Sequence, residues 1–407
     1  MLQQLKNVDF VLIASLLALI VLGLITLYSS SHTTLDGGLG SNFFLKQLIW
    51  VIIGFVAIII VFFMPNRWIF SSAYYLYGIS LFFLILVIFF GKSGQGADRW
   101  LQVGPISFQP SEFAKLASIL AIARYVSRDE VNLNTIKDFL FASLFIVIPF
   151  ILIIRQPDLG TSMVFIAIAL PMLYWAGLKL SNLFLIAMPI LIMLASFNFF
   201  TFLLLMVILV AYLFFSHRTK LILISNFLLN IAMGLLTPVL WNHLKPYQRN
   251  RIKIFLNPET DPRGAGYQII QSKVAIGSGG GLGKGFMQGS QTQLRFLPEQ
   301  HTDFIYAVIG EEFGFVGALT GLVLYFILLI RGVQIASLVK SKFNSTVAIG
   351  IVTLIAFHMI INIGMTVGLL PVTGLPLPFV SYGGSAMVTN MVMVGILLNF
   401  YKNRYEY

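Results

Sequence analysis

The chain has 407 residues, of which 58% are hydrophobic and only 10% are charged. A soluble protein carries about 25% charged residues, so this composition excludes a soluble globular domain and indicates a polytopic membrane protein. The absence of cysteine excludes a disulfide framework and thiolate chemistry. The net charge of +11 does not require a nucleic-acid partner, and we expect none, because Lys and Arg collect on the cytoplasmic loops of membrane proteins.

Apolar runs predict an all-α fold with about twelve transmembrane helices, since about 20 apolar residues span a bilayer. The predicted spans are 10–30, 44–64, 72–91, 111–127, 139–154, 159–177, 182–198, 200–216, 221–241, 304–330, 346–369 and 381–400. The segment 182–216 is either one very long helix or two helices with a turn near 198–201. Two helices are favoured, because two crossings leave the basic loops on the same side of the membrane. No flexible linker interrupts the chain, so 1–407 is predicted to be one membrane-embedded domain.

Basic residues collect on alternate loops, which predicts that both termini are cytoplasmic. Eight more lie in the long segment 242–303, predicted to be a large outside loop: Lys245, Arg249, Arg251, Lys253, Arg263, Lys273, Lys284 and Arg295. Long loops cross the membrane regardless of charge. A basic surface there suggests an anionic partner such as a phosphate-bearing lipid; the alternative is a solvated loop with incidental charge.

The stretch 91–116 is a glycine-rich loop followed by a helix start at Pro110 and Ser111. Glu112 and Lys115 are three residues apart and therefore share a helical face. Such a pair inside a span marks a site or holds helices together. Arg99 and Trp100 lie at the membrane edge, where Trp serves as an interfacial anchor or contacts substrate.

In "RQPDLGTS" (155–162), Pro157 and Gly160 break the chain between two spans. Arg155 and Asp158 are expected to lie close together, either in a site or in a charged turn. In "KPYQRNRIK", Arg249, Arg251 and Lys253 alternate and would share one face if extended. They are candidates for binding phosphate groups.

"GSGGGLGKG" (277–285) fails the phosphate-loop pattern, because Ser278 replaces the first Gly and Gly285 follows the Lys. A backbone nest for pyrophosphate stays open. "VTGLPLPFVSYGGSAM" (372–387) predicts a broken backbone lining a cavity or making a re-entrant turn. The five histidines show no metal-ligand spacing.

Acidic residues border and enter one apolar span in "LPEQHTDFIYAVIGEE", where Asp303 precedes the span and Glu311 and Glu312 fall inside it. From the residues alone, Asp303 is read as a partner of the helix dipole or as a functional acid. Glu311 and Glu312 are read as buried pair partners or as site residues.

Five stretches together resemble the SEDS (shape, elongation, division and sporulation) family of peptidoglycan polymerases. They are "GADRWLQVGPISFQPSEFAK", "RQPDLGTS", "YQRNRI", "GSQTQLRFLPEQHTDFIYAVIGEEFGFVG" and "PVTGLPLPFVSYGGSAM". "FQPSE" and "GSQTQLRFLPEQHTDF" look more like the elongation branch than the division branch. The family usually has ten spans, so an extra helix pair near 200–241 is expected.

The resemblance implies a glycosyltransferase that joins lipid II into glycan strands on the outer face of the bacterial cytoplasmic membrane. It implies a class B penicillin-binding protein (a transpeptidase) and other elongation-complex proteins as partners. Asp303 matches the family's essential acid, and Trp100, Glu112 and Lys115 match functional or cavity-lining positions. The other candidate substrate contacts are Arg99, Asp158, Arg249, Arg251, Arg263, Lys284, Glu299, His301 and Ser381.

The implied reaction is an inverting displacement of undecaprenyl pyrophosphate by a sugar 4-hydroxyl. It needs a base near the hydroxyl and positive charge near the leaving group. Arg249, Arg251 and Arg263 are the candidates for that charge, and a divalent cation (Mg²⁺ or Mn²⁺) is a candidate to share the work. Two other functions stay open: a lipid II flippase, and a noncatalytic scaffold of the cell-wall complex.

Overall fold

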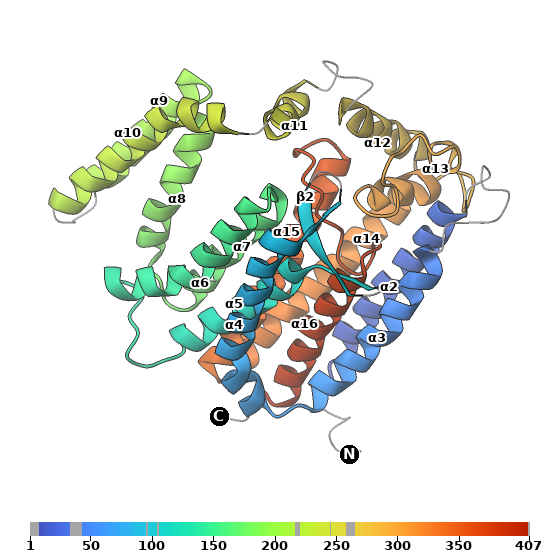
Figure 1. The fold of residues 1–407 in the computed structure, drawn as a ribbon, viewed down its shortest axis with the longest axis horizontal. Helices are drawn as coiled ribbons and strands as arrows, with labels where there is room; N and C mark the ends of the chain where they lie inside the picture. Colours follow the sequence, from blue (N-terminus) through green and yellow to red (C-terminus); the bar gives the residue numbers. More distant parts are fainter. Residues whose placement is uncertain are drawn as a thin grey trace. The chain divides into compact units, whose positions relative to one another are not determined.

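The computed structural model describes residues 8–32, 43–94, 97–103, 106–215, 220–244, 246–257 and 265–405. It divides into two compact units: Met1–Ala176 with Ile254–Tyr407, and Gly177–Lys253. The first unit holds most of the helices (Figure 1). They are α2 (Phe10–Ser31), α3 (Phe43–Phe63), α4 (Asn66–Phe90), α5 (Pro110–Val126), α6 (Ile136–Arg155), α7 (Leu159–Trp175), α12 (Ala265–Gly279), α13 (Ser290–Gln293), α14 (Ile305–Leu338), α15 (Lys342–Thr366) and α16 (Gly384–Lys402).

The core of the first unit lies along α5, α15 and α16. The most apolar windows of α15 and α16 are 61% and 67% buried, against 22% for α3 and α6. Helices that bury one stripe and expose the rest to lipid are expected at the edge of a membrane bundle, whereas central helices are buried all round. The polar groups of α5 and α15 are therefore inside the protein, where they need partners.

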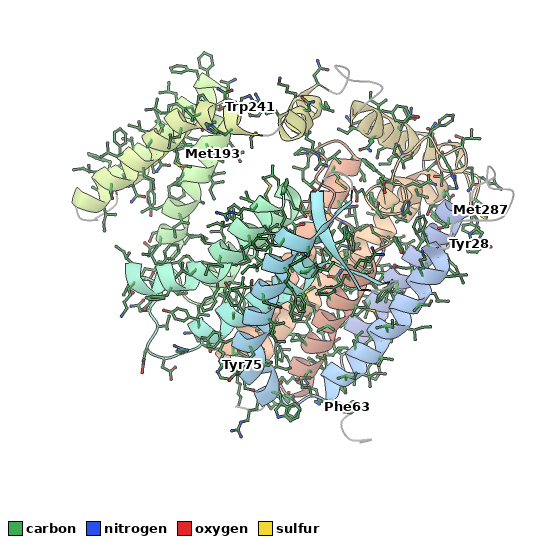
Figure 2. All side chains as sticks on the ribbon, in the orientation of Figure 1. Tyr28, Phe63, Tyr75, Met193, Trp241 and Met287 are labelled. Carbon is green, nitrogen blue, oxygen red and sulfur yellow. The ribbon has the colours of Figure 1, made fainter. Side chains whose placement is uncertain are left out.

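The chain ends of the first unit meet at one end of the bundle. Asp9, which caps α2, forms an ion pair with Arg331 of α14 at 2.7 Å, and the Arg331 guanidinium lies 5.8 Å from the Tyr401 ring of α16. Figure 2 shows Phe63 near this end and Tyr28 and Met287 at the opposite end. The helices nearest the two termini thus start and finish on the same side.

The predicted spans agree with the helices, since each of the twelve coincides with one helix of the structure. Among the described residues, eight helices are long and apolar enough to cross a membrane, and α7, α8 and α9 are shorter apolar helices. The protein is therefore a polytopic, all-α membrane protein. One addition is a small antiparallel sheet in the order β1 (Lys92–Gly94), β2 (Ala97–Val103), β3 (Ile106–Phe108).

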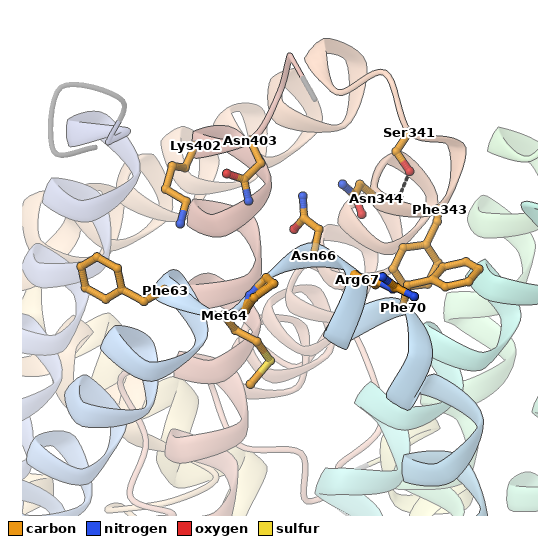
Figure 3. Close-up of a pocket in the computed structure, with 11 residues that line it drawn as sticks. Phe63, Met64, Asn66, Arg67, Phe70, Ser341, Phe343, Asn344, Lys402 and Asn403 are labelled. Carbon is orange, nitrogen blue, oxygen red and sulfur yellow. Dashed lines mark hydrogen bonds between the residues drawn. The ribbon is translucent and has the colours of Figure 1, made fainter. Parts of the chain in front are cut away.

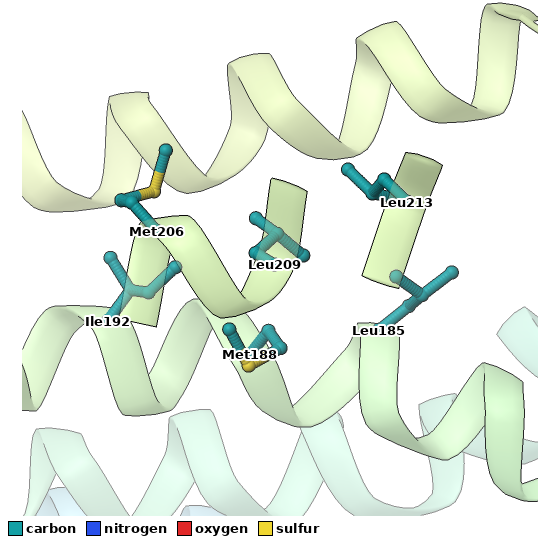
Figure 4. Packing of buried hydrophobic residues seen from close by; sticks show 6 residues of the cluster. All are labelled: Leu185, Met188, Ile192, Met206, Leu209 and Leu213. Atoms are coloured by element: carbon teal, nitrogen blue, oxygen red, sulfur yellow. The ribbon is translucent and has the colours of Figure 1, made fainter. Parts of the chain in front are cut away.

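The second unit is a helical hairpin packed on a third helix. Its helices are α8 (Leu180–Ala195), α9 (Phe199–Phe215) and α10 (Lys220–His243). Figure 4 shows its buried cluster: Leu185, Met188, Ile192, Met206, Leu209 and Leu213. The predicted turn between α8 and α9 is confirmed, because Asn198 Oδ1 accepts from Phe200 N at 2.9 Å and so supports a helix start.

The segment 242–303, predicted to be a large outside loop, contains regular secondary structure. It is not simply a loop, because it contains α11 (Pro246–Leu256), α12 and α13. Arg249 and Arg251 do not lie on an extended strand but in α11. Residues two apart in a helix are rotated by about 200°, so these two side chains leave the helix on nearly opposite sides.

Candidate active site

A cleft of about 270 Å³ lies in the first unit, where several helices begin. It is lined by Arg99, Trp100, Gln109, Glu112, Asp158, Thr161, Glu299, Thr302, Asp303, Gly374, Leu375, Pro376, Tyr382, Gly383, Ser385 and Ala386. Six predicted site residues meet there: Arg99, Trp100, Glu112, Asp158, Glu299 and Asp303. They come from β2, the first turn of α5, the start of α7 and the turn before α14.

Asp303 lies in the turn that precedes α14, whose N-cap residue is Phe304. The backbone carbonyl of Asp303 accepts from Asn362 Nδ2 at 3.0 Å, and the same amide donates to the Leu375 carbonyl at 2.8 Å. A Cβ built on Gly374 would lie 3.5 Å from Asp303 Oδ2, and Gly374 has φ +75°. A glycine there adopts the left-handed conformation without strain and lets the loop approach the carboxylate.

A polar network holds this turn against the 377–383 segment. Ser381 Oγ donates to the Thr302 carbonyl at 2.6 Å and accepts from Leu377 N at 2.9 Å. Gln47 of α3 donates to the Ser381 carbonyl and accepts from Gly383 N, both at 3.2 Å. Ser381 is 4% exposed. The structure therefore gives Ser381 a role in positioning Asp303 rather than a place on the cleft wall.

His301 is held as an aromatic group beside the cleft. Its ring stacks on Phe43 with centroids 4.2 Å apart, and its carbonyl accepts from Tyr382 N at 2.9 Å. Burial lowers the pKa of His301, while Glu299, 3.9 Å away, acts in the opposite direction. The imidazole is therefore neutral at pH 7 and is not a cation for phosphate. Glu299 itself has φ +50°, a strained conformation for a non-glycine residue.

Glu112 and Lys115 form the predicted pair, with 2.8 Å between Lys115 Nζ and Glu112 Oε2. Both side chains are buried, and Lys115 Nζ also lies 3.2 Å from His358 Nε2 of α15. Because an ammonium has no lone pair, Nε2 must accept this hydrogen bond. A buried ion pair with an extra partner therefore links α5 to α15 at the cleft wall, which Glu112 lines.

Asp158 pairs with Arg99 rather than with Arg155. Arg99 Nε lies 3.3 Å from Asp158 Oδ2, while Arg155 is exposed. Asp158 also caps α7 by accepting from Thr161 N at 3.0 Å and Thr161 Oγ1 at 2.8 Å. The ion pair fixes Arg99 of β2 over the start of α7. The described ion pairs of Asp158 thus involve Arg99, and the predicted proximity of Arg155 to Asp158 stays a prediction.

The glycine-rich segment 277–285 is hydrogen-bonded to α14 on both sides of a break in that helix, and we call this arrangement the clasp. Gly314 has φ 64° and ψ −159°, which interrupts the helix. The carbonyls of Glu311 and Glu312 accept from Lys284 N and Gly285 N, each at 3.0 Å, and Phe315 N donates to the Gly280 carbonyl at 2.9 Å. The amides of Lys284 and Gly285 are therefore used within the fold and are not available to a pyrophosphate.

The two glutamates of α14 serve this clasp. Glu311 is fully buried and accepts from Lys284 Nζ (2.9 Å), Gln291 N (2.8 Å) and Thr292 N (3.0 Å). Glu312 accepts from Ser29 Oγ of α2. Of the two alternatives that the sequence left open for Glu311 and Glu312, the structure favours buried pair partners over site residues. Lys284 is committed to Glu311 and does not line the cleft.

The remaining predicted phosphate ligands are not placed at the cleft. Arg249 and Arg251 belong to the Gly177–Lys253 unit, and Arg263 lies outside the described residues. Among the described residues that line the cleft, Arg99 is the one Lys or Arg. Within the described parts of the chain, no cluster of three or more His, Cys, Asp or Glu side chains is arranged to hold a metal ion.

Sequence reasoning missed several supporting residues, among them Gln47, Thr302, Asn362 and Tyr382. A signal was present for two of them. Gln47 and Asn362 are polar residues within apolar helices and are almost fully buried, and polar groups in spans tend to mark functional sites. Thr302 and Tyr382 carry no such signal, because they lie in segments that are polar throughout.

Fold and site together define a polytopic membrane protein with a carboxylate-rich cleft at one end of its helical bundle. A model of the FtsW/RodA/SpoVE family, described as cell cycle protein, matches residues 10–202 and 181–406. The chain belongs to this family, as its motifs predicted.

Relatives of similar length support the assignment. The chain is 38% identical to the peptidoglycan glycosyltransferase MrdB of Escherichia coli K12, covering 98% of this chain and 94% of the relative. It is 34% identical to the peptidoglycan glycosyltransferase RodA of Treponema pallidum, with 97% of each covered. It is 36% identical to stage V sporulation protein E of Bacillus subtilis, with 96% of each covered.

Solved structures show the same fold. A chain from a peptidoglycan synthase complex, studied for the coordination of polymerization and crosslinking, superposes with a TM-score of 0.75 at 29% identity, covering 98% of this chain and 99% of that one. The rod shape determining protein RodA of Thermus thermophilus superposes with a TM-score of 0.65 at 24% identity, covering 98% of both chains.

Proposed function

We propose that this protein polymerises lipid II into glycan strands for cell elongation, with Asp303 as the catalytic carboxylate. The glycosyltransferase class follows from its family, because full-length relatives are named peptidoglycan glycosyltransferases. The observation that carries the finer proposal is the meeting of Asp303, Glu299, Arg99 and Trp100 in one cleft. Arg99 and Trp100 come from one motif and Glu299 and Asp303 from another, about 200 positions further along the chain, so the fold brings two distant motifs together at one place.

In the proposed reaction, the acceptor 4-hydroxyl attacks C1 of the donor sugar. The new C–O bond forms as the bond to undecaprenyl pyrophosphate breaks, with inversion at C1. Asp303 takes the hydroxyl proton, which requires only that its carboxylate reach the acceptor. The hydrogen bond from Asn362 to the Asp303 carbonyl holds this turn at the cleft before substrate arrives.

Arg99 is the cleft's candidate for the departing pyrophosphate. Asp158 orients its guanidinium from one side, which leaves other N–H donors of the fork for phosphate oxygens. Asp303 and Glu299 place two carboxylates on the wall of the same cleft. A Mg²⁺ or Mn²⁺ ion is proposed to bind these carboxylates together with substrate phosphates, since Mg²⁺ commonly uses one or two carboxylates plus phosphate oxygens.

The active cleft is proposed to face the outer side of the bacterial cytoplasmic membrane, with both termini in the cytoplasm. The bias of basic residues supports this orientation. A class B penicillin-binding protein is proposed as partner. The support is the solved chain of similar fold, which comes from a complex that couples polymerization to crosslinking.

A lipid II flippase is the competing function. The test is polymerisation of purified lipid II by the purified protein in detergent, with and without the partner transpeptidase. Glycan strands formed in detergent support the proposal, because a flippase has no two compartments to connect there. If no strands form in either reaction, while proteoliposomes containing the protein translocate lipid II, the polymerase assignment is wrong.

A further inference from the structure

A second cavity, of about 590 Å³, lies at the end of the first unit opposite the cleft. It is formed by the turn between α3 and α4, the turn between α14 and α15, and the end of α16 (Figure 3). The cleft contains Gly383 and Ser385 at the start of α16, whereas this cavity contains Lys402 at its end. The 19 residues of α16 separate them by about 28 Å, close to the thickness of a bilayer core.

The charged side chains that line this cavity are all cationic. They are Arg67 and Lys402, accompanied by the amides of Asn66, Asn344 and Asn403. No carboxylate is among its lining residues in the described part of the chain. This composition is the opposite of that of the cleft and favours an anion.

Two of these side chains have donors that the protein does not use. Arg67 forms no hydrogen bond or ion pair with any residue that the structure describes. Asn344 is only 6% exposed, yet its side-chain amide has no hydrogen-bond partner among the described residues; only its backbone N–H is bonded, to Ser341 Oγ. The N–H groups of the Asn344 amide, which lines the cavity, are therefore available to a ligand there.

Helix polarity adds to the positive field. Both α4 and α15 begin at this cavity, at Asn66 and Lys342. The N-cap residue of α4 is Pro65, which provides no side-chain acceptor. The free N–H groups of a first turn carry partial positive charge and favour anions.

We propose that this cavity binds a phosphate group. The Arg67 guanidinium provides a fork for its oxygens, Asn344 donates one further bond, and Lys402, whose Nζ also donates to the Phe62 carbonyl at 2.7 Å, adds charge. Basic pockets between transmembrane helices suit anionic lipid head groups, and the exposed rings of Phe63 and Phe70 provide an apolar rim. The phosphate therefore belongs either to a lipid head group or to a phosphorylated solute.

The test titrates delipidated protein in neutral detergent with dioctanoyl-phosphatidylglycerol, dioctanoyl-phosphatidylcholine and inorganic phosphate, read by native mass spectrometry. A Lys or Arg near anionic lipid adds about 1 kcal/mol, which is about fivefold in affinity. Arg67→Gln should weaken phosphatidylglycerol binding about fivefold, and Arg67→Gln with Lys402→Gln about 30-fold. Arg128→Gln is the matched control, because Arg128 is exposed at the same end, beside Tyr74, and does not line the cavity; its affinity should be unchanged.

The ligands separate the two sources. Tighter binding of phosphatidylglycerol than of inorganic phosphate identifies a lipid head group, and equal competition by inorganic phosphate identifies a solute. Arg67→Gln loses no hydrogen bond or ion pair to a described residue, so its fold should survive, and a melting curve checks this. Absence of saturable binding, or equal affinity of the wild type and the Arg67→Gln variant, overturns the proposal.

Discussion

Asn362 donates one side-chain amide to two backbone carbonyls, those of Asp303 at 3.0 Å and Leu375 at 2.8 Å. It thereby joins α15, the turn before α14 and the loop that covers the Asp303 carboxylate. Asn362 is fully buried, so water cannot replace these bonds. The position of the proposed catalytic carboxylate therefore depends on a residue that does not line the cleft.

Asn362→Ala should lower glycan polymerisation at least tenfold, mainly through kcat, because the carboxylate loses its alignment. It should also destabilise the protein by about 1–3 kcal/mol, since two buried carbonyls lose a donor. Polymerisation rates at several lipid II concentrations and a melting curve measure both effects.

Asn399→Ala is the matched control. Asn399 likewise donates to backbone carbonyls, those of Val61, Phe62 and Met64. It lies near the C-terminal end of α16, whereas the cleft lies at the start of that helix. It should lose similar stability and keep its activity per folded molecule. Equal losses of activity in the two variants would reduce Asn362 to a general structural residue.

The break in α14 leads to a second prediction. A Cβ on Gly314 would lie 2.3 Å from Gly283 N, at a φ of +64°. Gly314→Ala should therefore prevent the clasp from closing and sharply lower the yield of folded protein. Gly277→Ala is the control from the same motif, because its Cβ would meet nothing within 4 Å; it should fold normally. Normal folding of Gly314→Ala, judged by size exclusion and melting, would contradict this account.

The buried pair at the cleft wall gives a third prediction. Lys115→Met should cost about 3–5 kcal/mol, because it leaves Glu112 buried without its cation. Adding Glu112→Gln should recover much of that stability. Melting curves of the wild type, the two single variants and the double variant together form a double-mutant cycle. Additive losses would show that the 2.8 Å contact does not couple the two residues.

His301 gives a prediction about pH. Burial lowers its pKa in the folded protein, so the unfolded chain binds more protons near the ordinary pKa of about 6.5. The contribution of His301 to the free energy of unfolding is therefore complete above pH 6.5 or so and is lost as the pH falls below about 6.5. The melting temperature should therefore drop more between pH 7 and pH 5 in the wild type than in His301→Phe, which keeps a ring against Phe43. Equal drops would exclude His301 as the source.

The helices could be predicted well from the sequence, because an apolar run that crosses a bilayer must satisfy its backbone hydrogen bonds internally and therefore forms a helix. The sequence predicted the pair of Glu112 and Lys115 because both lie on one helical turn. It did not identify the contact between Asp158 and Arg99, which are 59 positions apart along the chain, or the contact between Lys284 and Glu311. Those contacts depend on how the helices pack, and short-range spacing does not encode that.

Asp303→Asn should abolish glycan polymerisation and leave a folded, membrane-inserted protein. The N-cap of α14 is Phe304, and the bond from Asn362 goes to the Asp303 backbone, so the exchange removes neither the cap nor the link. Asn is nearly isosteric with Asp but cannot accept the hydroxyl proton or offset the charge of a cation. Loss of a general base lowers a rate about 10²–10⁴-fold, which is easily resolved as strand length from lipid II. A purely structural role predicts instead a lower melting temperature with near-normal polymerisation, and that result would refute the assignment of Asp303.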